Sequence, residues 1–221
     1  MKVPKSHSFF SEAEKEKIRR AVESAEVKTS GEIATMIVDH SDRYQEAEVM
    51  GGVLVAGLVA LMISVAAHYA AILSHIPLDM TVWSFVPLVF ILYFPARSLF
   101  IRFPHLKLPF INKFRLMHGV RERAIRAFYE KRLYRTREEN GILVFISILE
   151  RKVWVLGDRG VDRKISHDTW NALAREISAG IREGRACEAL CAVIEKCGTI
   201  LAEHFPKKND DINELPDDLL T

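Results

Sequence analysis

The chain has 221 residues, of which 49% are hydrophobic and 27% charged, and its 31 basic and 29 acidic side chains give a net charge of +2. High apolar content with little net charge excludes a disordered chain, and three cysteines exclude a disulfide-rich scaffold. The near-neutral total also argues against a dedicated nucleic-acid binder, so nucleic acid is not an expected partner.

The first 48 residues predict a helix followed by a strand. Residues His7–Glu26 have helical periodicity, and Ser11 with Glu14 forms a capping-box pattern. Thr29–Gly31 interrupts that pattern, and Glu32–Val38 is typical of a strand. We interpret residues 1–48 as the first part of an α/β domain.

A long apolar run follows, and it contains a predicted membrane span. From Val49 to Leu78 there are 30 residues without Asp, Glu, Lys or Arg. Its centre, Gly51–Leu73, is long enough to cross a bilayer core of about 30 Å as a helix. A fully buried helix in a globular core is the alternative, but it would need far more surrounding protein than this chain supplies.

A second apolar run predicts a return crossing. Met80–Ala96 has 17 residues without a formal charge, at the lower length limit for a spanning helix. Pro87 lies within the run and is expected to kink it. A re-entrant or interfacial helix is the alternative. With only Ser74–Met80 between the runs, residues 49–96 are predicted to form a transmembrane helical hairpin.

The flanking charges predict its orientation. Ser74–Met80 has no Lys or Arg, whereas Arg97–Arg137 has twelve against two acids. The positive-inside rule places the basic segment in the cytoplasm, and two crossings place the N-terminal region there too. Met1–Lys28 has no apolar signal-peptide core. We therefore expect a multi-pass protein of the plasma membrane with both termini cytoplasmic and the lipid bilayer as partner.

Residues 97–137 form a basic juxtamembrane segment that ends in a helix. Ser98–Phe114 mixes aromatic, aliphatic and basic residues, which suits a segment at an anionic headgroup surface; a plain linker is the alternative. Met117–Tyr134 predicts a basic helix with a narrow apolar stripe. Its exposed arginines are candidate ligands of lipid headgroups, or simply a solvated face: Arg121, Arg123 and Arg126.

Residues 138–206 predict the second part of the α/β domain, and residues 207–221 an acidic flexible tail. Neither flank alone is large enough to bury a good core, so we expect both flanks to fold as one unit. The expected elements are two antiparallel strands followed by two helices: Ile142–Ile148, Val153–Leu156, Ser166–Ala179 and Arg185–His204.

A series of short motifs runs through both flanks in a fixed order: Thr29–Ile33, Asn140–Asp162, Trp170, the Arg182–Gly184 turn, His204–Pro206 and Asn213–Pro216. In this series the flanks resemble the TPM-domain family, formerly a domain of unknown function, in its bacterial membrane-inserted subgroup. The resemblance implies a TPM-like mixed-sheet sandwich with helices on both faces, attached to the bacterial inner membrane and interrupted by the two-helix hairpin.

The resemblance also implies two activities. Relatives include thylakoid proteins linked to photosystem repair, for which acid phosphatase activity is claimed, and calcium-binding bacterial domains. Most members with an inserted hairpin have no established activity, and this chain departs from the long extracytoplasmic form of the family.

An acidic loop is the candidate metal site. Asp158 and Asp162 follow a strand end, where carboxylates and backbone carbonyls supply the oxygen ligands that Ca²⁺ or Mg²⁺ prefers. Glu32 and Glu150 are expected to add ligands only if the fold brings them close. The alternative is that the aspartates bind loop amides or pair with neighbouring arginines.

No catalytic motif of the common nucleotide-binding, metallohydrolase or serine-hydrolase types is present, so the catalytic residues are left unassigned. The favoured function is a non-enzymatic module that binds a membrane or cytoplasmic protein partner or maintains other membrane proteins. The alternative is a membrane-anchored, metal-dependent phosphomonoesterase.

Overall fold

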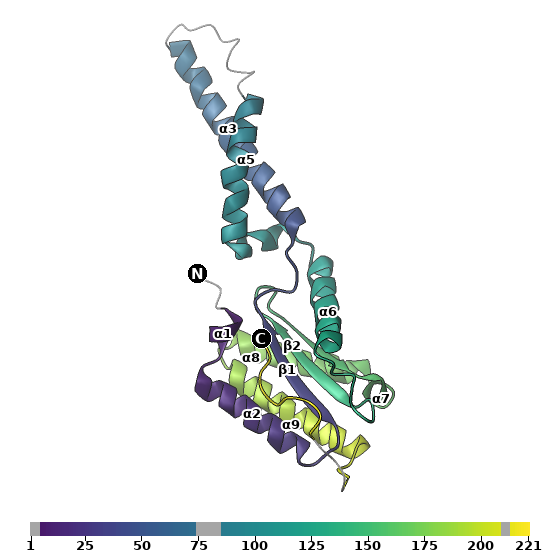
Figure 1. The fold of residues 1–221 in the computed structure, drawn as a ribbon. Helices are drawn as coiled ribbons and strands as arrows, with labels where there is room; N and C mark the ends of the chain where they lie inside the picture. The colour runs from purple at the N-terminus through teal and green to yellow at the C-terminus, as the bar shows by residue number, and fades with distance from the viewer. Residues whose placement is uncertain (1–4, 74–84, 209–212) are drawn as a thin grey trace. The chain divides into compact units, whose positions relative to one another are not determined.

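Residues before and after the apolar runs fold together in a computed structural model that describes residues 5–73, 85–208 and 213–221 (Figure 1). One compact unit combines Met1–Asp42 with Leu116–Thr221, and a second comprises Arg43–Arg115. Residues of both flanks therefore lie in one compact unit.

The first unit is built on a three-stranded mixed sheet in the order β1-β2-β3. β1 (Glu32–Val38) runs parallel to β2 (Gly141–Ser147), with Glu32 opposite Gly141. β3 (Lys152–Gly157) returns antiparallel to β2, as the hairpin pattern predicted. β2 is central and buried along its whole length, which explains its nearly continuous apolar sequence.

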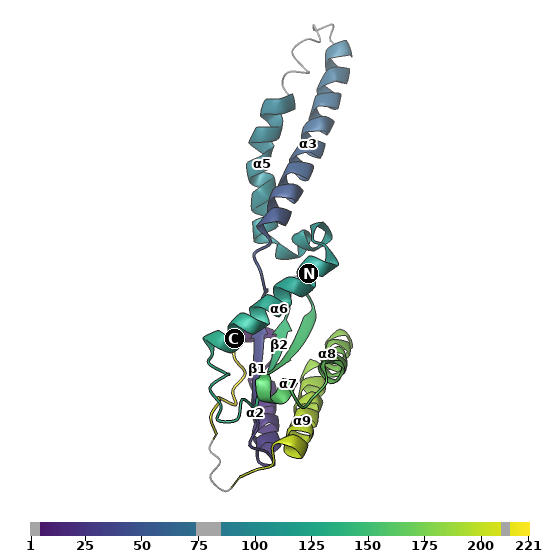
Figure 2. The same cartoon turned by 90° about the vertical axis from the view of Figure 1, so that its right-hand side faces the viewer.

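Three helices cover one face of this sheet (Figures 1 and 2). They are α2 (Glu12–Glu26), α8 (His167–Arg182) and α9 (Ala186–His204), each with an apolar stripe among charged residues. These apolar stripes pack against alternate residues of the strands and form a hydrophobic core. Its fully buried members include Ile18, Val22, Ile33, Ile37, Ile142, Val144, Ile177, Leu190, Ile194 and Leu201.

One helix, α6 (Lys113–Glu130), covers the opposite face. Its predicted apolar stripe is buried, and it packs against the other set of alternating strand residues. Helices therefore lie on both faces of the sheet. This second core contains Val120, Ala124, Ala127 and Phe128 of α6 with Ala34, Met36, Leu143 and Phe145 of the strands.

The C-terminal residues differ from the flexible tail that was expected. Leu220 lies beside β1: its N–H donates to Thr35 O at 2.9 Å, and its O accepts from Ile37 N at 2.9 Å. Leu215 is buried in the second core. Residues 213–221 are held because two leucines among the acids bury apolar surface and because β1 offers its outer edge for pairing.

Capping residues determine where several helices begin. The predicted helix over residues 7–26 is two helices, α1 (Ser6–Phe9) and α2, because Ser11 caps a new N-terminus. Ser11 N donates to Glu14 Oε2 at 2.8 Å while Ser11 Oγ accepts from Glu14 N at 3.3 Å, which completes the capping box. After β3, Asp158 caps the short α7 (Arg159–Asp162), in place of the expected loop.

The second unit contains α3 (Gln45–Leu73), α5 (Phe85–Arg102) and the 3₁₀ helix η1 (Pro104–Phe110). By length and composition, α3 and α5 are each able to cross a membrane. Pro87 falls in the first turn of the described helix, and Pro95 is its interior proline. The predicted turn Ser74–Met80 lies outside the described residues.

α3 and α5 pack through small residues of α3. A Cβ added at Gly51 would clash with the ring of Phe100, and one at Gly52 would lie 3.3 Å from the Cα of Arg97. Close approach through glycine and alanine is typical of helices packing in membranes. Apart from Glu48, the residues that α3 buries are all small: Ala47, Gly51, Gly52, Ala56, Ala60 and Ala71.

The segment expected at the headgroup surface folds against its own helices. Ser98–Arg102 continues α5, and η1 packs on α3 and α5. Lys107 Nζ lies 2.6 Å from Glu48 Oε1 and donates to Arg43 O at 2.9 Å; Lys107 and Glu48 are both buried. Lys107 therefore neutralises a buried carboxylate within the protein, an arrangement that sequence spacing could not reveal.

Candidate functional site: a groove at the free edge of β3

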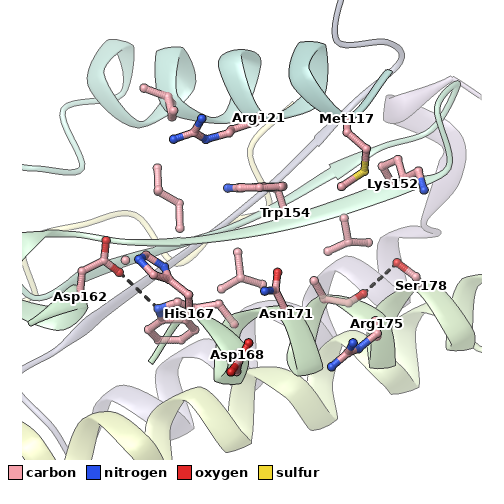
Figure 3. Close-up of a pocket in the computed structure, with 17 residues that line it drawn as sticks. Met117, Arg121, Lys152, Trp154, Asp162, His167, Asp168, Asn171, Arg175 and Ser178 are labelled. Carbon is pink, nitrogen blue, oxygen red and sulfur yellow. Dashed lines mark hydrogen bonds between the residues drawn. The ribbon is translucent and has the colours of Figure 1, made fainter. Parts of the chain in front are cut away.

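A groove of about 580 Å³ lies along β3, between α6 on one face of the sheet and α8 on the other (Figure 3). Figure 3 shows Met117 and Arg121 on α6 above the strand, Trp154 on β3, and residues of α8 below it. All residues that line the groove belong to the first unit. The groove is thus a property of the α/β domain itself.

The outer edge of β3 provides hydrogen-bonding groups to this groove. In the described part of the chain, β3 pairs only with β2. Asp158 N donates to Gly141 O at 2.8 Å, and hydrogen-bonded pairs alternate along an antiparallel ladder. The backbone N–H and C=O groups of Val153, Val155 and Gly157 therefore point away from β2, toward the open edge.

Aromatic side chains make the apolar part of the groove. Trp154 is half-buried, and Trp170 of α8 is buried. The indole Nε1 of Trp170 donates to Asp162 Oδ1 at 3.2 Å, which joins α7 to α8 at one end of the groove. These contacts fix the orientation of Trp170 and occupy one oxygen of Asp162.

The charged side chains of the groove are segregated along its length. Asp162 and Asp168 lie toward the Gly157 end of β3, whereas Lys152 and Arg175 lie toward its beginning (Figure 3). Arg121 of α6 lies between them. The groove therefore presents an acidic end and a basic end to any chain that lies along β3.

Asp158, the first predicted metal ligand, is used as a helix cap. Its Oδ1 accepts from Arg159 N at 2.8 Å, and its Oδ2 is buried without a hydrogen-bond partner among the residues that the structure describes. Burial raises the pKa of Asp158 above its ordinary value, opposed by the Arg159 N–H. Asp158 and Asp162 both lie on the short α7 turn at this end of the sheet.

The two glutamates of the predicted metal site lie at opposite ends of the sheet. Glu32 begins β1 at the Asp158 end, and it accepts from Glu214 N at 3.3 Å and Leu215 N at 3.1 Å. Glu150 follows β2 at the other end and accepts from Ser41 N at 2.9 Å. Glu150 therefore cannot share an ion with Asp158 in this fold.

Over residues 5–73, 85–208 and 213–221, no group of three or more His, Cys, Asp or Glu side chains is arranged to hold a metal ion. The four predicted ligands do not fit a single Ca²⁺ or Mg²⁺ ion as they stand. The structure brings Asp158, Asp162 and Glu32 to one end of the sheet, each with its own hydrogen bonds, and leaves Glu150 apart.

The three arginines predicted to bind lipid headgroups have different surroundings. Arg121 lines the β3 groove. Arg123 donates to Glu130 Oε2 at 3.0 Å, and with Arg126 it lines a small cavity that includes Ser41. Headgroup binding by these arginines stays a prediction.

Comparison with known families supports the fold. Residues 111–200 match the family model described as the TPM domain, which spans α6, β2, β3, α7, α8 and most of α9. Residues 111–200 therefore match a TPM domain. The expected family is thus confirmed, and β1 and α2 complete the TPM-domain sheet and core from the N-terminal side of the apolar helices.

A solved structure shares the fold of the TPM-domain chain. The NMR structure of the BA42 protein from the psychrophilic bacterium Bizionia argentinensis is 21% identical, with a TM-score of 0.58 over 96% of this chain and 95% of that chain. At that identity the likeness establishes the fold alone. No curated protein matches this sequence.

Sequence reasoning identified the strands of the TPM domain but missed its groove. The signal was present in β3, whose residues alternate between buried and half-buried whereas β2 is buried throughout. That difference is typical of an edge strand. The residues that join it from α6 and α8 are far away in sequence, so only the tertiary structure brings them together.

Proposed function

We propose that this protein is an integral membrane protein of the bacterial inner membrane whose cytoplasmic TPM domain is a non-enzymatic module that binds a protein partner. The observation that carries the membrane part is the inverted burial of α3 and α5. Large apolar side chains are exposed, such as Leu58 at 54%, Met62 at 72% and Phe94 at 71%, while the residues that α3 buries are small apart from Glu48. Soluble helices show the reverse pattern.

Two other origins of such helices are a soluble core helix and a signal sequence. Only 22% of the apolar window of α3 and 11% of that of α5 are buried, which argues against core helices. α3 begins at Gln45, after a complete helix and strand of the TPM domain, which argues against a signal sequence.

The parallel pairing of β1 with β2 supports two crossings. β1 precedes both apolar helices and β2 follows them, yet the strands are neighbours in one sheet. A sheet cannot form across a bilayer, so the chain must return to the side that it left. If α3 spans, α5 must also span.

The distribution of basic residues supports the cytoplasmic side. Twelve Lys or Arg between Arg97 and Arg137 follow α5, while residues 74–80 contain none. Lys107 and Arg97 interact with Glu48, but the remaining cations preserve the asymmetry.

The groove at β3 favours binding over catalysis as the role of the TPM domain. It combines a free strand edge, two tryptophans and segregated charges, which are the features of a surface that recognises an extended chain. We infer a protein partner in the membrane or at its cytoplasmic surface.

Topology can be tested with paired reporter fusions in the intact protein. An alkaline phosphatase or fluorescent reporter at the N-terminus, at the C-terminus and within residues 74–80 should report cytoplasm, cytoplasm and periplasm. Mild-detergent capture with crosslinking should then recover a defined partner. Termini on opposite faces, or a chain that stays soluble without detergent, would overturn the proposal.

A second experiment tests the alternative function, that of a metal-dependent phosphomonoesterase. Purified protein is assayed against generic phosphate monoesters with Ca²⁺, with Mg²⁺ and with neither. We expect no turnover above that of a sample inactivated by heat. Metal-dependent turnover that is lost in Asp158→Ala would replace the binding proposal with the enzymatic one.

A further inference from the structure

We propose that the β3 groove binds an extended peptide segment of the partner, which adds to the sheet as a fourth strand antiparallel to β3. The inference deepens the proposed function and rests on it for the identity of the partner as a protein. It names the chemistry of the segment: a basic residue near its beginning and acidic residues at its end.

The strand edge requires an extended occupant. The N–H and C=O groups of Val153, Val155 and Gly157 point outward at every second residue, which matches the hydrogen-bond spacing of an added strand. The six residues of β3 give about 20 Å of edge, enough for a segment of about six residues. If such an edge stays exposed, its unpaired N–H and C=O groups can pair with strands of other molecules and cause aggregation.

The walls favour a single strand over a second copy of the domain. α6 and α8 both line the groove, one from each face of the sheet, so the edge lies between two helices (Figure 3). One added strand lies about 4.8 Å from β3 and fits between them. A second sheet would bring its own flanking helices into the same space.

Antiparallel pairing is slightly more stable per residue than parallel pairing, and the charges of the groove then set the order of charges in the added strand. An antiparallel segment begins near Gly157, where Asp162 and Asp168 lie, and ends near Lys152 and Arg175. A basic residue at its beginning and a carboxylate at its end would therefore meet opposite charges. A parallel segment with the same charges would meet like charges at both ends, which disfavours it.

Trp154 provides a second element of recognition. Its half-buried side chain points to the α6 side of the groove, as does that of Leu156, and the two are only partly covered by the second core. Alternate side chains of an added strand point to this side. Apolar residues at every second position of the peptide should therefore pack against Trp154.

The test uses the full chain in lipid nanodiscs and a synthetic peptide. The peptide begins with lysine, continues with alternating threonine and valine, and ends with two aspartates and a free carboxylate. We expect saturable binding by anisotropy of the labelled peptide. Hydrogen exchange should slow at the amides of Val153, Val155 and Gly157, which no merely electrostatic contact would protect.

Charge reversal supplies the decisive comparison. The double variant Lys152→Glu with Arg175→Glu makes both ends of the groove acidic, because Asp162 and Asp168 remain. It should bind the original peptide about tenfold more weakly, and it should bind a peptide with lysine at both ends and an amidated C-terminus more tightly than the original. Arg182→Glu, an exposed arginine of α8 outside the groove, is the matched control and should leave both affinities unchanged. Binding of the peptide with two lysines excludes misfolding of the variant.

Three results would overturn this inference. They are absence of binding to either peptide, binding without protection of the three edge amides, and protection that appears with protein concentration alone, which would assign the groove to a second copy. Reporter topology is measured separately. A chain that binds the peptide but fails the topology test refutes the membrane proposal and leaves the groove assignment standing.

Discussion

Glu32 lies opposite Gly141 in the parallel register of β1 and β2, although both apolar helices lie between them in the chain. This pairing makes the hairpin an insertion into a domain rather than a link between two domains. The domain core is shared by residues from both sides of the insertion, including Ile33 and Ile142. Folding of this domain therefore requires the chain segments on both sides of the apolar helices to come together.

The TPM domain should fold without the hairpin. Asp42 and Gly119 line the same small cavity, so a Gly/Ser linker of about six residues can replace residues 43–115. The shortened chain should be water-soluble and monomeric, with cooperative unfolding by circular dichroism. An insoluble or molten product would show instead that the hairpin contributes to the core.

Close packing of α3 on α5 should depend on Gly51. Gly51→Val would force a side chain into the ring of Phe100 and destabilise the hairpin by about 1–3 kcal/mol. Gly57→Val on the same helix is the control, because a Cβ there meets nothing within 4 Å. Thermal unfolding in detergent should separate the two variants. Equal melting temperatures would refute this packing.

The buried ion pair at the base of the hairpin should be costly to break. Lys107→Met leaves the buried Glu48 with the more distant Arg97, at 3.7 Å, and should destabilise the protein by about 3 kcal/mol. Adding Glu48→Gln should recover part of that loss. Glu46→Gln removes a more exposed partner, that of Arg115, and should cost less than about 1 kcal/mol. Chemical denaturation in detergent measures the free energy of unfolding of the three variants. Equal losses in Lys107→Met and Glu46→Gln would contradict the prediction.

Stability of the TPM domain should fall as pH rises, because of Glu26. Burial, reinforced by the nearby Glu32 and Asp217 carboxylates, raises the pKa of Glu26 to about 9 from an ordinary 4.5. The folded state then holds a proton that the unfolded state releases, so the contribution of Glu26 to stability is greatest below pH 4.5 and declines toward about pH 9. Because one proton is involved, the free energy of unfolding should fall by at most about 1.4 kcal/mol per pH unit.

Glu26→Gln should flatten that decline and stabilise the domain at neutral pH and above. The control is Glu23→Gln, a more exposed residue of the same helix that pairs with Arg19, which should leave the slope intact. Urea denaturation of the soluble domain at several pH values measures both. An unchanged slope in Glu26→Gln would refute the assignment of the titrating group.

Local patterns were sufficient for most elements. β2 was predicted because its residues are nearly all apolar, and α6 because Val120, Ala124 and Phe128 recur at helical spacing, and both were confirmed. The capping residues Ser11 and Ser166 were also readable, since a cap depends on neighbours within one turn. The same local logic failed at the C-terminus, where Leu220 finds its partner on β1.

By itself, the sequence determined the apolar helices, the strands and the family, because each depends on residue types at short spacing. Tertiary structure alone decided that Lys107 meets Glu48, that Glu150 lies apart from Asp158, and that α6, β3 and α8 enclose a groove. Those relations join residues separated by tens of positions. They arise from how helices pack on a sheet, which no local spacing specifies.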